Sequence, residues 1–136
     1  MSRLQLALNV TDLDAAIAFY TKLFKTEPHK VHPGYANFAI EDPPLKLVLF
    51  QAEQGGTINH LGVETSSSEE VSAEALRLAA QGLPTRVEQE TLCCYAVQDK
   101  VWVTGPDGLK WEVYTVLEDV PSAVSVSKPL QVHIQR

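Results

Sequence analysis

Apolar and polar residues alternate along this chain in a pattern that predicts one set of elements twice. Residues 4–10 alternate with a period of two, as a half-buried strand does, and apolar residues at helical spacing follow over 13–24. Thr11 or Asp12 starts that helix, and Thr11 with Asp14 three residues later is a capping-box pattern. Three short strands are then predicted near 28–32, 35–40 and 45–51. The first half thus predicts the order strand, helix and three strands.

The same order recurs after Gly55-Gly56. A strand is predicted over 58–64, and the next helix begins after Ser67 and ends at Gly82-Leu83-Pro84. The remaining strands are predicted over 85–91, about 96–104 and 110–116. We therefore expect one α+β domain over 1–117, built from tandem βαβββ modules at about 1–54 and 57–117. Residues 118–136, which are rich in Pro and Ser, predict a partly disordered C-terminal tail.

Composition narrows the function classes. The 136 residues, 45% of them hydrophobic and 21% charged, are enough for one soluble domain with its own core. The net charge of −6 and the lack of a basic run argue against nucleic acid as a partner. No apolar stretch is long enough for a signal peptide or a membrane span, so we expect a cytoplasmic protein.

Two tandem βαβββ modules resemble the vicinal oxygen chelate superfamily, which includes glyoxalases, extradiol dioxygenases and fosfomycin-resistance proteins. The resemblance covers about residues 1–116 and implies a cup-shaped mixed sheet that holds a divalent metal. In that family the ligands come from the first and last strands of each module, which gives four candidate positions.

Registering the two modules identifies these four positions. Gln5 and His60 have the same place in the first strands, and Leu47 and Glu112 match in the last strands. Gln5, His60 and Glu112 are then the metal ligands, with His60 and Glu112 as catalytic residues. Leu47 leaves coordination positions open for substrate or dioxygen, which is typical of a catalytic site. Gln5 has a second interpretation as a strand-edge hydrogen bonder, and Lys46 is expected to point away from the metal.

Cys93 and Cys94 are the only cysteines, and they are adjacent in sequence between two predicted strands. Two neighbouring thiols cannot form a disulfide framework, but they can chelate one thiophilic atom. A trivalent organoarsenical keeps one bond to carbon and has two positions for sulfur, and Cd(II) would also accept both thiolates. The alternatives are two small buried apolar side chains or a strained vicinal disulfide.

The resemblance is more specific at the level of motifs. The run Cys93-Cys94-Tyr95-Ala96-Val97-Gln98-Asp99-Lys100-Val101-Trp102-Val103 and the segment Trp111-Glu112-Val113-Tyr114 resemble the organoarsenical carbon–arsenic lyases and the related cadmium-induced proteins. This resemblance implies an Fe(II)-dependent dioxygenase that consumes O2, cleaves the C–As bond of trivalent methyl or aromatic arsenicals, and releases arsenite. Cys93 and Cys94 would bind the arsenic on a mobile loop that delivers the substrate to the iron.

Two other functions stay open at this point. A non-catalytic cadmium- or arsenite-binding resistance protein of the same fold would use the same cysteine pair. A glyoxalase-like isomerase would need a fourth polar ligand, against which Leu47 argues. Other divalent metals fit the same ligands, and the sequence is compatible with both a monomer and a homodimer, because one chain carries both modules.

Overall fold

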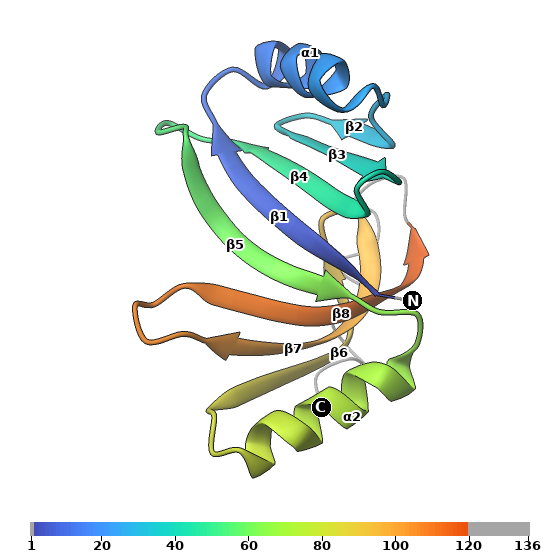
Figure 1. Cartoon of the computed structure of the whole chain (residues 1–136), viewed down its shortest axis with the longest axis vertical. Coiled ribbons are helices and arrows are strands. Elements are labelled where there is room, and N and C mark those ends of the chain that lie inside the picture. Colours follow the sequence, from blue (N-terminus) through green and yellow to red (C-terminus); the bar gives the residue numbers. More distant parts are fainter. Residues whose placement is uncertain (1, 120–136) are drawn as a thin grey trace. The chain divides into compact units, whose positions relative to one another are not determined.

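The computed structural model describes residues 2–119 and contains both predicted βαβββ repeats (Figure 1). The first repeat consists of β1 (Arg3–Val10), α1 (Leu13–Phe24), β2 (Lys30–His32), β3 (Tyr35–Ile40) and β4 (Leu45–Gln51). The second consists of β5 (Thr57–Glu64), α2 (Ser68–Ala80), β6 (Thr85–Cys93), β7 (Ala96–Thr104) and β8 (Lys110–Asp119). The α+β class and the repeated element order are therefore confirmed.

Contacts between residues divide the chain into two compact units within β5. One unit comprises Arg3–Gly62, and the other begins at Val63. The first strand of the second repeat thus contributes most of its length, including His60, to the first unit. In the described part of the chain, no helix is long and apolar enough to cross a membrane.

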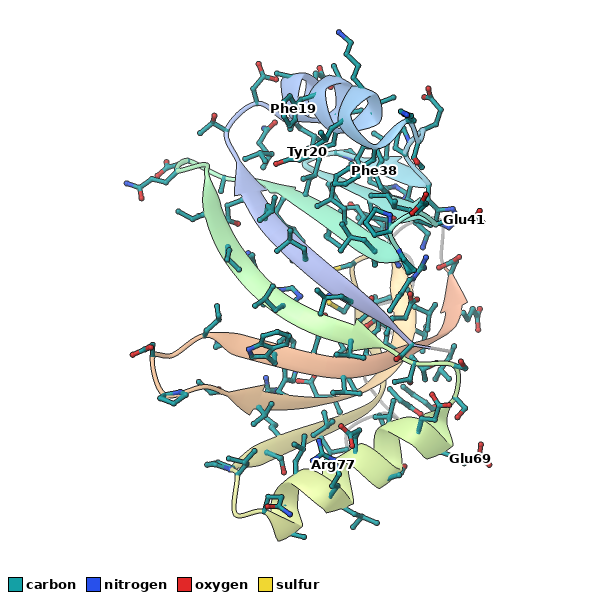
Figure 2. The ribbon with its side chains drawn as sticks, in the orientation of Figure 1. Phe19, Tyr20, Phe38, Glu41, Glu69 and Arg77 are labelled. Atoms are coloured by element: carbon teal, nitrogen blue, oxygen red, sulfur yellow. The ribbon has the colours of Figure 1, made fainter. Side chains whose placement is uncertain are left out.

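In the first unit the strands follow the order β2-β3-β4-β1-β5, with β1 parallel to β4 and β3 antiparallel to it. One face of these strands carries apolar side chains that pack against α1, and Phe38 lies on this face with Tyr20 of the helix (Figure 2). The buried residues of this core are Leu13, Ala36, Phe38, Ile40, Leu47 and Leu49. Strand alternation sends the residues between them to the opposite face.

Of the two predicted start residues of α1, Thr11 and Asp12, the structure has Asp12 as the cap. Asp12 is the N-cap residue, and its side chain accepts a hydrogen bond from the backbone N–H of Ala15 at 3.0 Å. The helix ends at Lys25, which adopts the left-handed conformation of a C-terminal cap. Between these caps, the apolar side of α1 packs against the strands of the first unit.

The position assigned to Leu47 in the sequence registration is wrong. Leu47 is 1% exposed and belongs to the core under α1, and its partner across the parallel ladder is Leu6. Lys46 is the residue in register with Gln5, so Lys46 shares a face with Gln5 and does not point away from it. Because side chains alternate with a period of two, an alignment error of one residue reverses the face of the strand.

In the second unit, β8, β7 and β6 form consecutive antiparallel pairs, and α2 packs on one face through Val71, Val101 and Val113. Ser67 caps α2 by accepting from the N–H of Glu70 at 3.2 Å, as the capping-box signal predicts. Residues of β7 and β8 that alternate with Val101 and Val113 therefore lie on the face opposite α2.

Two strand ends differ from the sequence prediction. The β6 strand extends through Cys93, so this cysteine is a strand residue and Cys94 is the first residue of the turn that follows. The β8 strand continues to Asp119, so the first residues of the predicted tail are part of the sheet. The rest of that tail, 120–136, lies outside the described residues.

Truncating Leu47 tests the revised register. Leu47→Ala removes a fully buried side chain, so we expect the free energy of unfolding to fall by about 2–5 kcal/mol in urea denaturation. Leu76→Ala is the matched control, because Leu76 is 74% exposed on α2 and its truncation should cost less than about 1 kcal/mol. A cost for Leu47→Ala as small as that of the control would contradict the placement.

Candidate functional site

Gln5 and His60 lie together in the first unit. The Nε2 atom of Gln5 is 3.2 Å from Nε2 of His60, although the two residues are 55 positions apart. Gln5 is buried, and the ring of His60 lies 6.3 Å from the ring of Phe50 on β4. The structure thus brings together two of the three predicted ligands, on the face opposite α1.

Asn59 orients the His60 ring. Its Oδ1 lies 2.8 Å from Nδ1 of His60, and because a carboxamide oxygen can only accept, Nδ1 carries the proton. The Nε2 lone pair therefore points towards Gln5. Asn59 is held in turn by Asn9, whose Oδ1 accepts from Nδ2 of Asn59 at 3.0 Å, and Asn9 donates to Thr57. Outer hydrogen bonds of this kind fix the tautomer of histidines that bind metals.

Further polar groups share this face of the first unit. Asn37 is buried and donates to the hydroxyl of Tyr35 at 2.8 Å, and the ring of Tyr35 packs against Phe50. Lys46 is in register with Gln5 on the neighbouring strand. Sequence reasoning missed Asn37 and Asn59. The alternation of β3 was the signal for Asn37, because a polar residue there interrupts an otherwise apolar strand.

Glu112, the third predicted ligand, belongs to the second unit and is buried with Lys100. Nζ of Lys100 donates to Oε1 of Glu112 at 2.7 Å, and the two residues are 1% and 4% exposed. Burial acts to lower the pKa of Lys100, but the charge and the hydrogen bond of the Glu112 carboxylate act to raise it, and the net pKa is raised. Lys100 is therefore an ammonium, and it stabilises the ionised form of Glu112.

The cysteine pair lies at a two-residue hairpin turn. Cys93 pairs with Ala96 across the β6–β7 ladder, and the turn residues Cys94 and Tyr95 have φ angles of 55° and 67°. Two positive φ angles define a type I′ turn, which normally takes Asn and Gly at these positions. Side chains larger than glycine are strained in this conformation, and strain of this kind gathers at functional sites.

The two thiols are positioned to act together. The Sγ atoms of Cys93 and Cys94 lie 3.2 Å apart, too far for a disulfide bond, and the side-chain amide of Gln98 donates to the carbonyl of Cys93 at 3.1 Å. The hydrogen bond from Cys93, followed by burial, raises the pKa of Cys94, whereas the charge of Lys100 acts in the opposite direction. Cys94 is therefore a neutral thiol at neutral pH.

Cys93 shares a face of its sheet with the Lys100–Glu112 pair. Residues paired across an antiparallel ladder lie on one face, so Cys93 lies on the face of its partner Ala96. Lys100 has the same alternation as Ala96 along β7 and therefore lies on that face too, opposite α2. The hairpin turn at Cys94 thus begins at a strand residue whose side chain is on the face that carries Lys100 and Glu112.

The donor set fits a divalent metal only if the amide of Gln5 takes part. In residues 2–119, no three His, Cys, Asp or Glu side chains gather closely enough to hold a metal ion. His60 presents the Nε2 lone pair that metals bind, and a half-turn of the Gln5 carboxamide would present Oε1 beside it. Imidazole nitrogen and amide oxygen, the two donors that the first unit brings together, both suit a first-row divalent metal.

Comparison with known proteins identifies the family. The model of the glyoxalase/bleomycin resistance protein/dioxygenase superfamily matches residues 3–113, which span both repeats. The chain belongs to this superfamily. Among solved structures of similar fold, the Mn(II)-bound glyoxalase from Novosphingobium aromaticivorans has a TM-score of 0.64 and 23% identity, over 88% of this chain and 42% of that chain. The 2,3-dioxygenase LapB from Pseudomonas has a TM-score of 0.67 and 20% identity, over 87% and 41%.

Two other proteins are much more similar to this chain in sequence than these solved structures are. The cadmium-induced protein CadI of Mycobacterium tuberculosis is 66% identical over 120 residues, which cover 88% of this chain and 79% of the relative. The trivalent organoarsenical cleaving enzyme of Thermomonospora curvata is 60% identical over 121 residues, which cover 88% and 80%. The family resemblance found in the sequence is therefore confirmed.

Replacing Asn59 tests the tautomer of His60. In Asn59→Leu the Nδ1 proton loses its acceptor, so we expect a larger population with the proton on Nε2. Nitrogen-15 NMR of the imidazole rings measures this population directly. His29, which is exposed and precedes β2, is an internal control. Unchanged His60 nitrogen shifts in the variant would show that Asn59 does not select the tautomer.

The raised pKa of Cys94 predicts a strong pH dependence of its alkylation. Because the thiolate is the nucleophile and Cys94 is neutral at neutral pH, its rate with iodoacetamide should rise about tenfold per pH unit between pH 7 and 9. Cys93→Ala removes the hydrogen bond that contributes most to the shift, so alkylation at pH 8 should become faster. A rate for Cys94 that is constant over this pH range, followed by mass spectrometry, would contradict the neutral thiol.

Proposed function

We propose that this protein is an Fe(II)- and O2-dependent dioxygenase that cleaves the C–As bond of trivalent organoarsenicals and releases arsenite. The observation that carries the proposal is the cysteine pair, whose Sγ atoms lie 3.2 Å apart and whose Cys93 lies on the sheet face of the buried Lys100–Glu112 pair. The name of the Thermomonospora curvata relative, a trivalent organoarsenical cleaving enzyme, supports the same activity. Trivalent methyl and aromatic arsenicals are the substrate class.

Substrate capture requires only the two thiols. A trivalent arsenical R–As(OH)2 reacts with Cys93 and Cys94 to form two As–S bonds and two molecules of water. The protons of the thiols leave with the hydroxyl groups, so no net charge is added to the site. The carbon substituent stays on the arsenic throughout, and the preformed hairpin turn determines the direction in which it projects.

The sulfur separation is close to the span that trivalent arsenic needs. Two bonds of about 2.3 Å, the length of zinc–thiolate bonds, span about 3.2 Å between the sulfurs when they meet near a right angle and about 3.8 Å at a tetrahedral angle. Trivalent arsenic is pyramidal because a lone pair occupies its fourth position, so its bonds meet near a right angle. The observed 3.2 Å between Cys93 and Cys94 matches the pyramidal case.

Gln5, His60 and Glu112 would hold the metal. Asn59 keeps the proton of His60 on Nδ1, so Nε2 is the donor, and Lys100 keeps Glu112 ionised. Fe(II) bound by one imidazole, one carboxylate and one amide would supply the redox chemistry that activates dioxygen, because such a set leaves open positions. Lys46, next to Gln5 in the ladder, adds a cation and no fourth ligand.

The second candidate is a binding protein without turnover. The 66% identity to a protein named cadmium-induced favours it, because a thiol pair could sequester cadmium or arsenite by the same chelation. Neither function needs a second chain, since one chain carries Gln5, His60, Glu112 and both cysteines. We therefore propose a monomer or a homodimer, and a reducing, cytoplasmic environment that keeps the thiols reduced.

Arsenite release distinguishes the two candidates. Purified protein loaded with Fe(II) should convert phenylarsenite to arsenite in air and not under argon, as measured by liquid chromatography with arsenic-specific mass detection. His60→Ala should capture phenylarsenite but release less than about 1% of the wild-type arsenite, and Cys93→Ser should lose capture. Stoichiometric binding of phenylarsenite with no arsenite in air would establish the binding protein instead.

A further inference from the structure

Gln98 of β7 holds the peptide group that joins the two cysteines. Its side-chain Nε2 donates a hydrogen bond to the carbonyl oxygen of Cys93 at 3.1 Å. That oxygen belongs to the planar peptide unit between Cys93 and Cys94, which is the covalent link between the two side chains. Rotation of this unit changes ψ of Cys93 and φ of Cys94 together, and with them the directions in which the two side chains leave the backbone. The hydrogen bond from Gln98 therefore holds the two thiols in one relative orientation.

The backbone at Cys94 is strained, so its orientation depends on such a restraint. The φ angle of 55° is left-handed, and this conformation costs free energy for a residue that has a Cβ atom. If the peptide unit before Cys94 turned over, φ would become negative and the strain would be relieved. The strain and one hydrogen bond are of similar magnitude. The bond from Gln98 is therefore enough to change the balance between the two orientations.

The tip of the hairpin that carries the cysteines is short and begins at Gln98. The β6–β7 ladder has a register shift before Thr91, and three residue pairs follow it, from Thr91–Gln98 to Cys93–Ala96. The β7–β8 ladder also has a register shift, between Val97 and Gln98. Irregularities of this kind bend a strand and interrupt its regular hydrogen bonds. The side chain of Gln98 thus adds a contact where regular pairing has just been interrupted.

The amide of Gln98 is a poor choice for stability alone. Gln98 is 6% exposed, and among the residues that the structure describes its Oε1 atom is buried and has no hydrogen-bond partner. A buried acceptor without a partner lowers the stability of a fold, whereas an apolar side chain of the same size does not. The hydrogen bond to Cys93 is a reason for an amide at this position that does not depend on stability.

We propose that Gln98 is a positioning residue for substrate capture, because it holds the peptide unit between Cys93 and Cys94 and so directs both thiols at one arsenic atom. This inference rests on the proposed capture of trivalent arsenicals by the cysteine pair. Only a compound with two exchangeable positions on arsenic gains from two sulfurs held 3.2 Å apart. Gln98 thereby contributes to capture by both thiols and not to the reactivity of either thiol alone.

Two arsenicals that form different numbers of As–S bonds test this role. Phenylarsenite exchanges two hydroxyl groups for thiols, whereas dimethylarsinite has one hydroxyl group and exchanges only that one. Calorimetry under argon, without added iron, measures the affinity of the wild type and of Gln98→Met for each compound. In the variant we expect the affinity for phenylarsenite to fall about fivefold to tenfold, the loss typical of one hydrogen bond. The affinity for dimethylarsinite should stay within about twofold of the wild type.

A purely structural role of Gln98 predicts a different pattern. Loss of a stabilising contact would weaken the binding of both arsenicals and lower the thermal unfolding midpoint. Gln98→Met removes the unpaired Oε1 together with the hydrogen bond, so we expect the midpoint to stay unchanged or to rise. Gln89→Met makes the same change at an exposed position of β6 and should alter neither affinity. Equal weakening of both arsenicals in Gln98→Met, or wild-type affinity for phenylarsenite, would overturn the proposal.

The outcomes separate this inference from the proposed function. If the wild type does not bind phenylarsenite, both fail. If it binds phenylarsenite but releases no arsenite with Fe(II) in air, the dioxygenase fails and the inference on capture is still decided by the two affinities. If it releases arsenite and Gln98→Met binds phenylarsenite as tightly as the wild type, only the inference fails. If Gln98→Met does not fold, Gln98→Asn, whose amide is one methylene group further from the Cys93 carbonyl, decides by the same two affinities.

Discussion

In each repeat, one face of the strands packs against a helix, and this packing determines which residues lie on the other face, where the candidate site residues are. In the first unit, apolar residues of β1, β3 and β4 pack against α1. In the second unit, Val101 and Val113 do the same against α2. Because alternate residues of a strand face opposite sides, the residues between these apolar positions share the remaining face. Gln5 and Lys46 are placed in this way in the first unit, and Lys100 and Glu112 in the second.

This constraint explains what could be predicted from the sequence. The apolar residues whose spacing predicts the strands and helices are also the residues that pack in the two cores. The element order and the α+β class could therefore be predicted from the sequence. The superfamily followed from the repeat. The exact position of a residue within its strand was harder to predict. The alignment of the two modules matched Leu47 with Glu112, and it was wrong by one residue. Whether Gln5, His60 and Glu112 bind a metal stays a prediction.

Polar contacts between side chains were beyond the reach of the sequence. The link from Asn59 to His60 depends on two adjacent residues of one strand turning their side chains towards each other, which no periodicity encodes. The burial of Lys100 beside Glu112 depends on the ladder that places β7 against β8. A lysine in a strand normally indicates an exposed position, so its pattern alone gave no reason to place it in the interior.

The hairpin turn at Cys94 and Tyr95 has a consequence for affinity. One atom that joins the sulfurs of Cys93 and Cys94 closes a small ring, and ring closure normally costs conformational entropy at the moment of binding. Here the backbone is already bent into a left-handed turn. This conformational entropy is therefore lost when the hairpin folds and not when the ligand binds. The same linkage acts in reverse: an arsenical bound to both thiols would hold the tip of β6 and β7 together and raise the stability of the hairpin.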